Sequence, residues 1–93
     1  MTFEEFDALL AQARAEVEEL HRSEPNDRAI LSVKLQLAAL HEWTRGGRRP
    51  TQAEKDRLNF GLLASRELDT YPIADTLYEL ASFVTWWGHK RPY

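Results

Sequence analysis

Hydrophobic residues recur at steps of three and four along four stretches of the chain, the spacing of one face of an α-helix. The first stretch extends to about residue 22 and has its apolar positions at Phe3, Phe6, Leu10, Ala13, Val17 and Leu20. Thr2 and Glu5 stand just before this pattern with the spacing of an N-terminal capping box. Acidic residues lie off the apolar face, at Glu4, Asp7, Glu16, Glu18 and Glu19. We therefore expect an acidic first helix.

A second amphipathic helix is expected between Asp27, which can cap its start, and Gly46-Gly47, which can end it. Its apolar stripe is formed by Ile30, Val33, Leu37 and Leu40, and it is widened by Leu31 and Leu35. A stripe this wide is typical of a helix that contacts two neighbours. The following segment, "RGGRRP" at residues 45–50, is the only concentrated basic stretch of the sequence.

A third helix is expected from Thr51, which forms a second capping box with Glu54, to a tight turn at residues 69–72. One of its faces carries Leu58, Leu62, Ser65 and Leu68. Pro72 fits the first position of a fourth helix, which Gly88 would end. The apolar stripe of this fourth helix consists of Ile73, Leu77, Leu80, Val84 and Trp87.

Four helices, short turns and the lack of a strand pattern predict an all-α fold, a compact antiparallel bundle of about four helices. The 93 residues are close to the lower limit of what folds alone on a single core. We therefore expect residues 1–93 to form a single helical domain.

Two features of the third helix oppose its local stability. Gly61 lies inside it, where glycine costs roughly 1 kcal/mol relative to alanine. Glu67 and Asp69 crowd its C-terminal end, where the helix dipole favours cations. Close approach of another helix over Gly61 would offset the first cost. For Asp69, capping of the fourth helix and contact with a partner are both open.

Composition excludes several classes of function. The chain is 43% hydrophobic and 29% charged, a balance typical of a folded domain, and its net charge of −3 disfavours nucleic-acid binding. Cysteine is absent from the sequence, so it offers no disulfide and no thiolate nucleophile. The acidic N-terminus does not resemble a signal peptide, and no apolar run approaches the ~18 residues of a membrane-spanning helix. We expect a soluble, cytoplasmic protein that binds neither nucleic acid nor membrane.

Candidate catalytic or metal-binding patterns are weak. The three histidines, His21, His41 and His89, are not spaced as ligand pairs, and no serine has a G-x-S-x-G context. Glu18 and His21 do have the Glu-x-x-His spacing of di-metal bundles. However, Glu18 lies off the apolar face and a second such motif is missing from the sequence. We therefore expect no catalytic residue, no cofactor and no bound metal.

The aromatic residues are more numerous than one small core requires. Trp87 belongs to the fourth stripe, whereas Tyr78, Phe83 and Trp86 lie off it. These side chains either pack on flanking helices or form an exposed patch. Exposed aromatic residues beside acids are typical of a protein interface.

Two stretches, "ILSVKLQL" at 30–37 and "RLNFGLLASRELDTYPIADTLYEL" at 57–80, resemble the small all-helical immunity proteins of bacterial type VI secretion. The closest resemblance is to the family that neutralises NAD(P)+-glycohydrolase effectors. It covers about two-thirds of the chain, and the first helix shows only general similarity. The shared positions are Leu31, Ser32, Gln36, Leu37, Arg57, Leu58, Gly61, Ala64, Glu67, Asp69, Leu77 and Leu80.

The resemblance implies a non-enzymatic protein of packed helices that acts in competition between bacteria. It would bind one cognate toxin domain and block the active site of that toxin. The "RGGRRP" loop and the C-terminal "TWWGHKRPY" depart from the family pattern, so specificity can differ there.

The expected contact surface follows from charge. A toxin that binds a dinucleotide should have a cationic cleft, into which an acidic protein would be steered. The residues expected to bind the partner are Glu67, Asp69, Tyr71, Tyr78 and Trp86. An alternative face is the acidic first helix around Glu16 and Glu19. Two other functions stay open: a helical module that forms homo-oligomers through its aromatic residues, and an antitoxin-like regulator, which the net charge disfavours.

Overall fold

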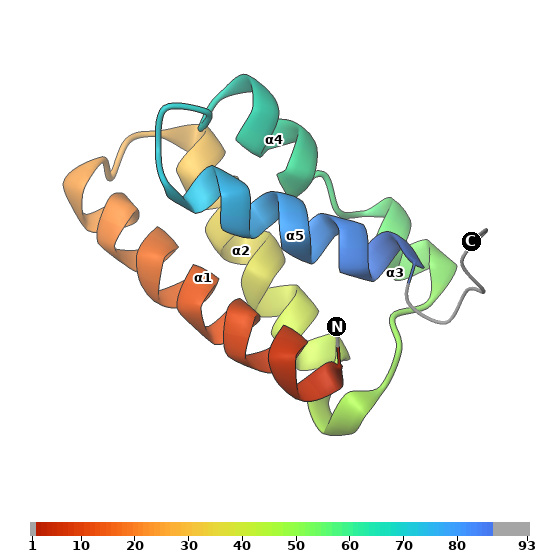
Figure 1. Cartoon of the computed structure of the whole chain (residues 1–93). Coiled ribbons are helices and arrows are strands. Elements are labelled where there is room, and N and C mark those ends of the chain that lie inside the picture. The colour runs from red at the N-terminus through yellow and green to blue at the C-terminus, as the bar shows by residue number, and fades with distance from the viewer. Residues whose placement is uncertain (1, 87–93) are drawn as a thin grey trace.

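The computed structural model describes residues 2–86, with only the backbone of Trp86, and these residues form helices and connecting turns without a strand (Figure 1). The helices in chain order are α1 (Phe3–Ser23), α2 (Arg28–Trp43), the 3-10 turn η1 (Arg45–Gly47), α3 (Gln52–Asp56), α4 (Phe60–Arg66) and α5 (Ile73–Trp86). α1 packs against α2 and α5, and α4 packs against the same two helices. Neighbouring helices run in opposite directions, so the predicted antiparallel all-α bundle is confirmed.

The core lies between α1, α2, α4 and α5. Most of its buried residues belong to the apolar stripes expected for the first, second and fourth helices, as far as Val84, whereas Leu31 and Leu35, expected to widen the second stripe, are exposed. The core side chains are Phe6, Leu10, Ala13, Val17, Ile30, Val33, Leu37, Leu40, Phe60, Ala64, Leu68, Ile73, Ala74, Leu77, Leu80 and Val84. Burial of one such side chain stabilises the fold by roughly 1.5–3 kcal/mol. The expected roles of Trp87 and Gly88 lie outside the described residues.

The helix starts and stops follow the signals in the sequence. The Thr2 hydroxyl accepts the Glu5 N–H at 3.2 Å, and the Asp27 carboxylate accepts the Ile30 N–H at 3.1 Å. These contacts cap α1 and α2. Gly46 and Gly47 have φ values of 72° and 88°, a left-handed backbone that favours glycine and prevents α2 from continuing.

The expected third helix is instead two short helices, α3 and α4, separated at residues 57–59. Asn59 has φ −137° and ψ 21°, and its N–H donates to the side-chain oxygen of Gln36 on α2 at 2.7 Å. The Gln36 amide nitrogen also donates to the Asn59 side-chain oxygen and to the Ser32 hydroxyl. Contact with α2 therefore replaces a helical hydrogen bond at Asn59. As a result, Leu62 does not lie on a buried face and is 50% exposed.

Gly61 lies in the first turn of α4, against α5. A methyl group added at Gly61 would lie 2.9 Å from the Cβ of Ala81, which confirms the expected close approach of another helix. Asp69, in contrast, does not occupy the cap position of α5. That helix begins at Ile73, and residues 67–72 form a wider turn than the sequence suggested.

Candidate partner-binding surface

The residues expected to bind a partner are spread over the turn before α5 and along this helix to its last residue. Glu67 and Asp69 are exposed in the turn that precedes this helix, and Tyr71 is half-buried against the core. Tyr78 is 42% exposed on α5 itself. Trp86 is the last residue of this 14-residue helix, so it lies roughly 20 Å from the turn. The side chain of Trp86 lies outside the described part of the chain.

Aromatic residues off the fourth apolar stripe were expected either to pack on a flanking helix or to be exposed, and Phe83 does the first. Its ring stacks on Phe6 of α1, with centroids 4.9 Å apart and an interplanar angle of 24°. Phe83 therefore packs on a flanking helix, whereas Tyr78 contributes to the exposed surface. Both of the interpretations offered by the sequence apply, each to a different residue.

A cleft of about 390 Å³ lies between the C-terminal half of α1 and the start of α5. We call it the acid-rimmed cleft, and its lining residues are Glu16, Glu19, Leu20, Ser23, Tyr71, Pro72 and Ile73. It joins part of the predicted contact set, Tyr71, to Glu16 and Glu19 of the alternative face. The two faces that the sequence suggested separately therefore meet here.

Local packing fixes the wall of the acid-rimmed cleft. Leu68 is fully buried, and its carbonyl accepts the Tyr71 N–H at 2.9 Å. The Tyr71 carbonyl accepts the Ala74 N–H at 3.1 Å, which joins the turn to α5. Ile73 belongs to the core, and Leu20 packs against that core from α1. The apolar wall is therefore held by both helices.

The polar side chains that line the acid-rimmed cleft are two carboxylates, Glu16 and Glu19, and two hydroxyl-bearing residues, Ser23 and Tyr71, and the lining includes no basic side chain. Glu16 accepts a hydrogen bond from Gln12 at 2.8 Å, and Glu19 pairs with Arg22 at 2.7 Å. Both pairs lie on the surface of α1, where such contacts contribute little to stability. The Arg22 and Glu19 side chains remain 66% and 74% exposed, so both are accessible to a partner.

A second cleft, of about 450 Å³, lies between α2 and the α3–α4 junction. Its walls include Leu35, Trp43 and Arg57, and the guanidinium of Arg57 lies 5.8 Å from the centre of the Trp43 ring. Leu31 and Leu35 are 39% and 60% exposed. Sequence reasoning missed this surface, although the wide apolar stripe of the second helix was its signal.

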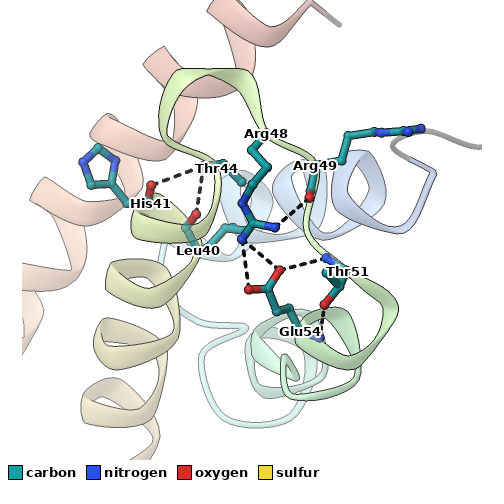
Figure 2. A network of polar contacts seen from close by, with 7 residues as sticks. All are labelled: Leu40, His41, Thr44, Arg48, Arg49, Thr51 and Glu54. Carbon is teal, nitrogen blue, oxygen red and sulfur yellow. Dashed lines mark hydrogen bonds and ion pairs between the residues drawn. The ribbon is translucent and has the colours of Figure 1, made fainter.

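The basic "RGGRRP" loop connects α2 to α3, and Figure 2 shows its polar contacts. Arg48 binds both carboxylate oxygens of Glu54 at 3.0 and 3.1 Å and donates to the Arg49 carbonyl at 3.3 Å. The Thr51 N–H donates to Glu54 at 2.8 Å, and the Glu54 N–H donates back to the Thr51 hydroxyl at 3.1 Å. The second capping box is thus confirmed, and Arg48 of the preceding loop binds the Glu54 carboxylate of this box.

Charge in this loop is largely paired. The Thr51 N–H and the Arg48 guanidinium hold the pKa of Glu54 below its usual value, because both stabilise the carboxylate. Arg45 pairs with Glu42 at 3.0 Å. The buried Thr44 hydroxyl donates to the Leu40 carbonyl at 2.8 Å (Figure 2). Arg45 and Arg48 are therefore each paired with an acidic side chain, although both stay exposed.

The two residues of the candidate Glu-x-x-His motif have separate surroundings. The Glu18 carboxylate accepts a hydrogen bond from Lys34 of α2 at 3.1 Å. The Nδ1 atom of His21 is buried without a hydrogen-bond partner. Across residues 2–86, no group of three or more His, Asp or Glu side chains is placed to hold a metal ion. Among the same residues, no helix has the length and apolarity required to cross a membrane.

Comparison with known proteins shows to which family the sequence belongs. The family model Tsi6, which describes a type VI secretion immunity family, matches residues 5–84. Neither a curated protein nor a solved structure gave a significant match. The match confirms the resemblance to type VI immunity proteins, whereas the NAD(P)+-glycohydrolase target stays a prediction. The chain belongs to the Tsi6 family of type VI secretion immunity proteins.

Proposed function

We propose that this protein binds one cognate secreted antibacterial toxin, an NAD(P)+ glycohydrolase, and blocks its active site. The observation that carries the proposal is the family match over residues 5–84, since an immunity family implies a toxin protein as partner. The protein would act as a single helical domain in the cytoplasm, where the dinucleotide substrate is found. Inhibition by occlusion requires no catalytic residue, cofactor or metal of its own.

The distribution of charge supports this function. A site that holds a dinucleotide needs positive charge around the phosphates, and acidic groups complement such a site. Glu67 and Asp69 project from the turn between α4 and α5, and Glu16 and Glu19 border the adjoining acid-rimmed cleft. The basic loop, in contrast, is paired with Glu42 and Glu54, which gives an antitoxin-like regulator of nucleic acid little support.

The proposed contact set remains Glu67, Asp69, Tyr71, Tyr78 and Trp86, with the turn as its centre. Replacing Glu67 or Asp69 by lysine should mainly slow association, because like charges would then meet as the proteins approach. Trp86→Ala should mainly speed dissociation. The loss of binding free energy should be about 2 kcal/mol if the side chain is an interface anchor.

Self-association is a second candidate, favoured by the exposed leucines Leu31 and Leu35 on α2. Light scattering of the purified protein separates this candidate from the first. A stable dimer that dissociates in Leu35→Glu would favour the helical oligomer, whereas a monomer would leave toxin binding as the function.

Competition tests the proposal. We expect the cognate toxin domain to be encoded beside this protein's gene. It should bind the protein and NAD+ mutually exclusively, so a saturating NAD+ analogue should raise the apparent Kd of the complex. Simultaneous binding of both, measured by calorimetry on a catalytically inactive toxin variant, would show that the active site is not blocked.

A further inference from the structure

We propose that the acid-rimmed cleft receives one arginine side chain from the toxin domain. This inference rests on the proposed function and adds a specific docking point to it. The occupant would project from the basic surface of the toxin, with its stem against the apolar wall and its guanidinium at the acidic rim.

The shape of the cleft suits a long side chain. Its volume of about 390 Å³ is at the lower end of the roughly 300–1,000 Å³ typical of ligand pockets, which leaves room for one long side chain. The wall consists of Leu20, the Tyr71 ring, Pro72 and Ile73. Long basic side chains bury their methylene stems on such surfaces while the charged head stays at the edge.

The charge at the mouth selects a cation. Glu16 and Glu19 are three positions apart on α1, which places their Cβ atoms about 5–6 Å from each other. Two carboxylates can therefore reach the same guanidinium. The existing partners of these acids, Gln12 and Arg22, lie on exposed helix surface, where a partner can replace them.

Arginine fits this arrangement better than lysine does. Its planar guanidinium donates in several directions at once and also stacks on aromatic rings. Tyr71 supplies a ring in the wall, and the two carboxylates supply acceptors at the rim. The cleft beside α2 lacks this single-signed charge, because Asp56 and Arg57 both line it.

The first test places an arginine in the cleft from this protein itself. Ser23 lines the cleft and is the exposed last residue of α1, where a cation is favourable to the helix dipole. Ser23→Arg should therefore fold normally but weaken binding of the toxin domain encoded beside the gene by roughly thirtyfold or more. Ala11→Arg is the matched control, because Ala11 is an exposed residue of the same helix that lies five and eight positions before Glu16 and Glu19, and the change in net charge is the same. It should bind within about threefold of the parent.

The second test removes the acids. Glu16→Gln combined with Glu19→Gln should weaken the same complex by roughly thirtyfold, since an arginine of the toxin would lose its partners. The control is Glu4→Gln combined with Asp7→Asn, which removes two exposed charges with the same spacing at the other end of α1. Circular dichroism confirms that each variant is folded before its Kd is measured.

The outcomes distinguish this inference from the proposed function. If the cleft variants bind and inhibit the toxin like the parent, the cleft is not the docking point, but the immunity function stands. If the control variants lose as much affinity for the toxin as the cleft variants do, overall charge is the cause of the effect, and the inference is overturned. If the unmodified protein does not bind the toxin domain, the proposed function itself fails.

A photo-crosslinking residue at Ser23 identifies the occupant directly. The toxin peptide recovered from the complex by mass spectrometry should contain an arginine at or next to the crosslinked position. Recovery of a peptide without any arginine would contradict the assignment.

Discussion

Gly61 of α4 faces Ala81 of α5 so closely that a methyl group on the glycine would lie 2.9 Å from the alanine Cβ. An alanine side chain has no flexible end that could move away, so the two helices would have to separate. This contact explains why glycine occupies the first turn of α4. The close packing of α4 on α5 compensates for the low helix propensity of glycine.

Gly61→Ala should therefore destabilise the protein, by about 1–2 kcal/mol, although alanine is the better helix former. Ser65→Ala is the control on the exposed surface of the same helix and should change stability by less than about 0.5 kcal/mol. Urea denaturation followed by circular dichroism measures both. A stabilised Gly61→Ala variant would show that α4 and α5 are not in tight contact.

Gln36→Ala should loosen the junction between α3 and α4. The variant removes the acceptor of the Asn59 N–H, a bond worth about 1 kcal/mol, so exchange of the Asn59 amide should quicken by roughly fivefold. Gln52→Ala is the control, because Gln52 only bonds Asp56 within one exposed turn. Unchanged amide protection at Asn59 in Gln36→Ala would mean that the contact with α2 does not hold the junction.

The Glu54 carboxylate should make the stability of the protein depend on pH in the acidic range. Its folded-state pKa lies below the usual 4.5, so its stabilising effect is present above that value and is lost as pH falls through the folded-state pKa. Glu54→Gln should thus have a lower melting temperature than the parent at pH 7, and the difference should shrink toward pH 3. A difference that is constant over this range would rule out the carboxylate as its cause.

Two aspartates that precede helices should differ in their effect on stability. Asp27→Ala removes the cap of α2 and should cost about 1 kcal/mol. Asp69→Ala should change the free energy of unfolding by less than about 0.5 kcal/mol, because Asp69 lies outside the cap position of α5. Equal losses in the two variants would restore a capping role for Asp69.

Periodicity in the sequence was sufficient to predict the main helices and their buried faces. Residues such as Val17, Leu37 and Leu77 are buried because they recur on one helical face, a property that each segment carries by itself. The caps at Thr2 and Asp27 are likewise local, since each bonds a residue three positions away.

Contacts between segments far apart in the sequence could not be predicted from periodicity or local caps. Gln36 and Asn59 are 23 residues apart, so the break between α3 and α4 could not be read from the continuous amphipathic pattern. The sequence drew attention to Tyr71 and to Glu16 for separate reasons, and only the packing of α1 beside α5 places them around one cleft. Capping of the next helix by Asp69 was one of two readings that the sequence left open, and only the structure shows that the turn extends to residue 72, so that α5 begins at Ile73.

The proposed function is inhibition of the cognate toxin by occupation of its active site. The most direct measurement is the initial rate of NAD+ hydrolysis by the neighbouring toxin domain, titrated with the purified protein. Occlusion of the active site should produce a linear loss of activity that reaches completion at one protein per toxin, with an apparent inhibition constant that rises with NAD+ concentration. Full hydrolysis by a stoichiometric complex would contradict it.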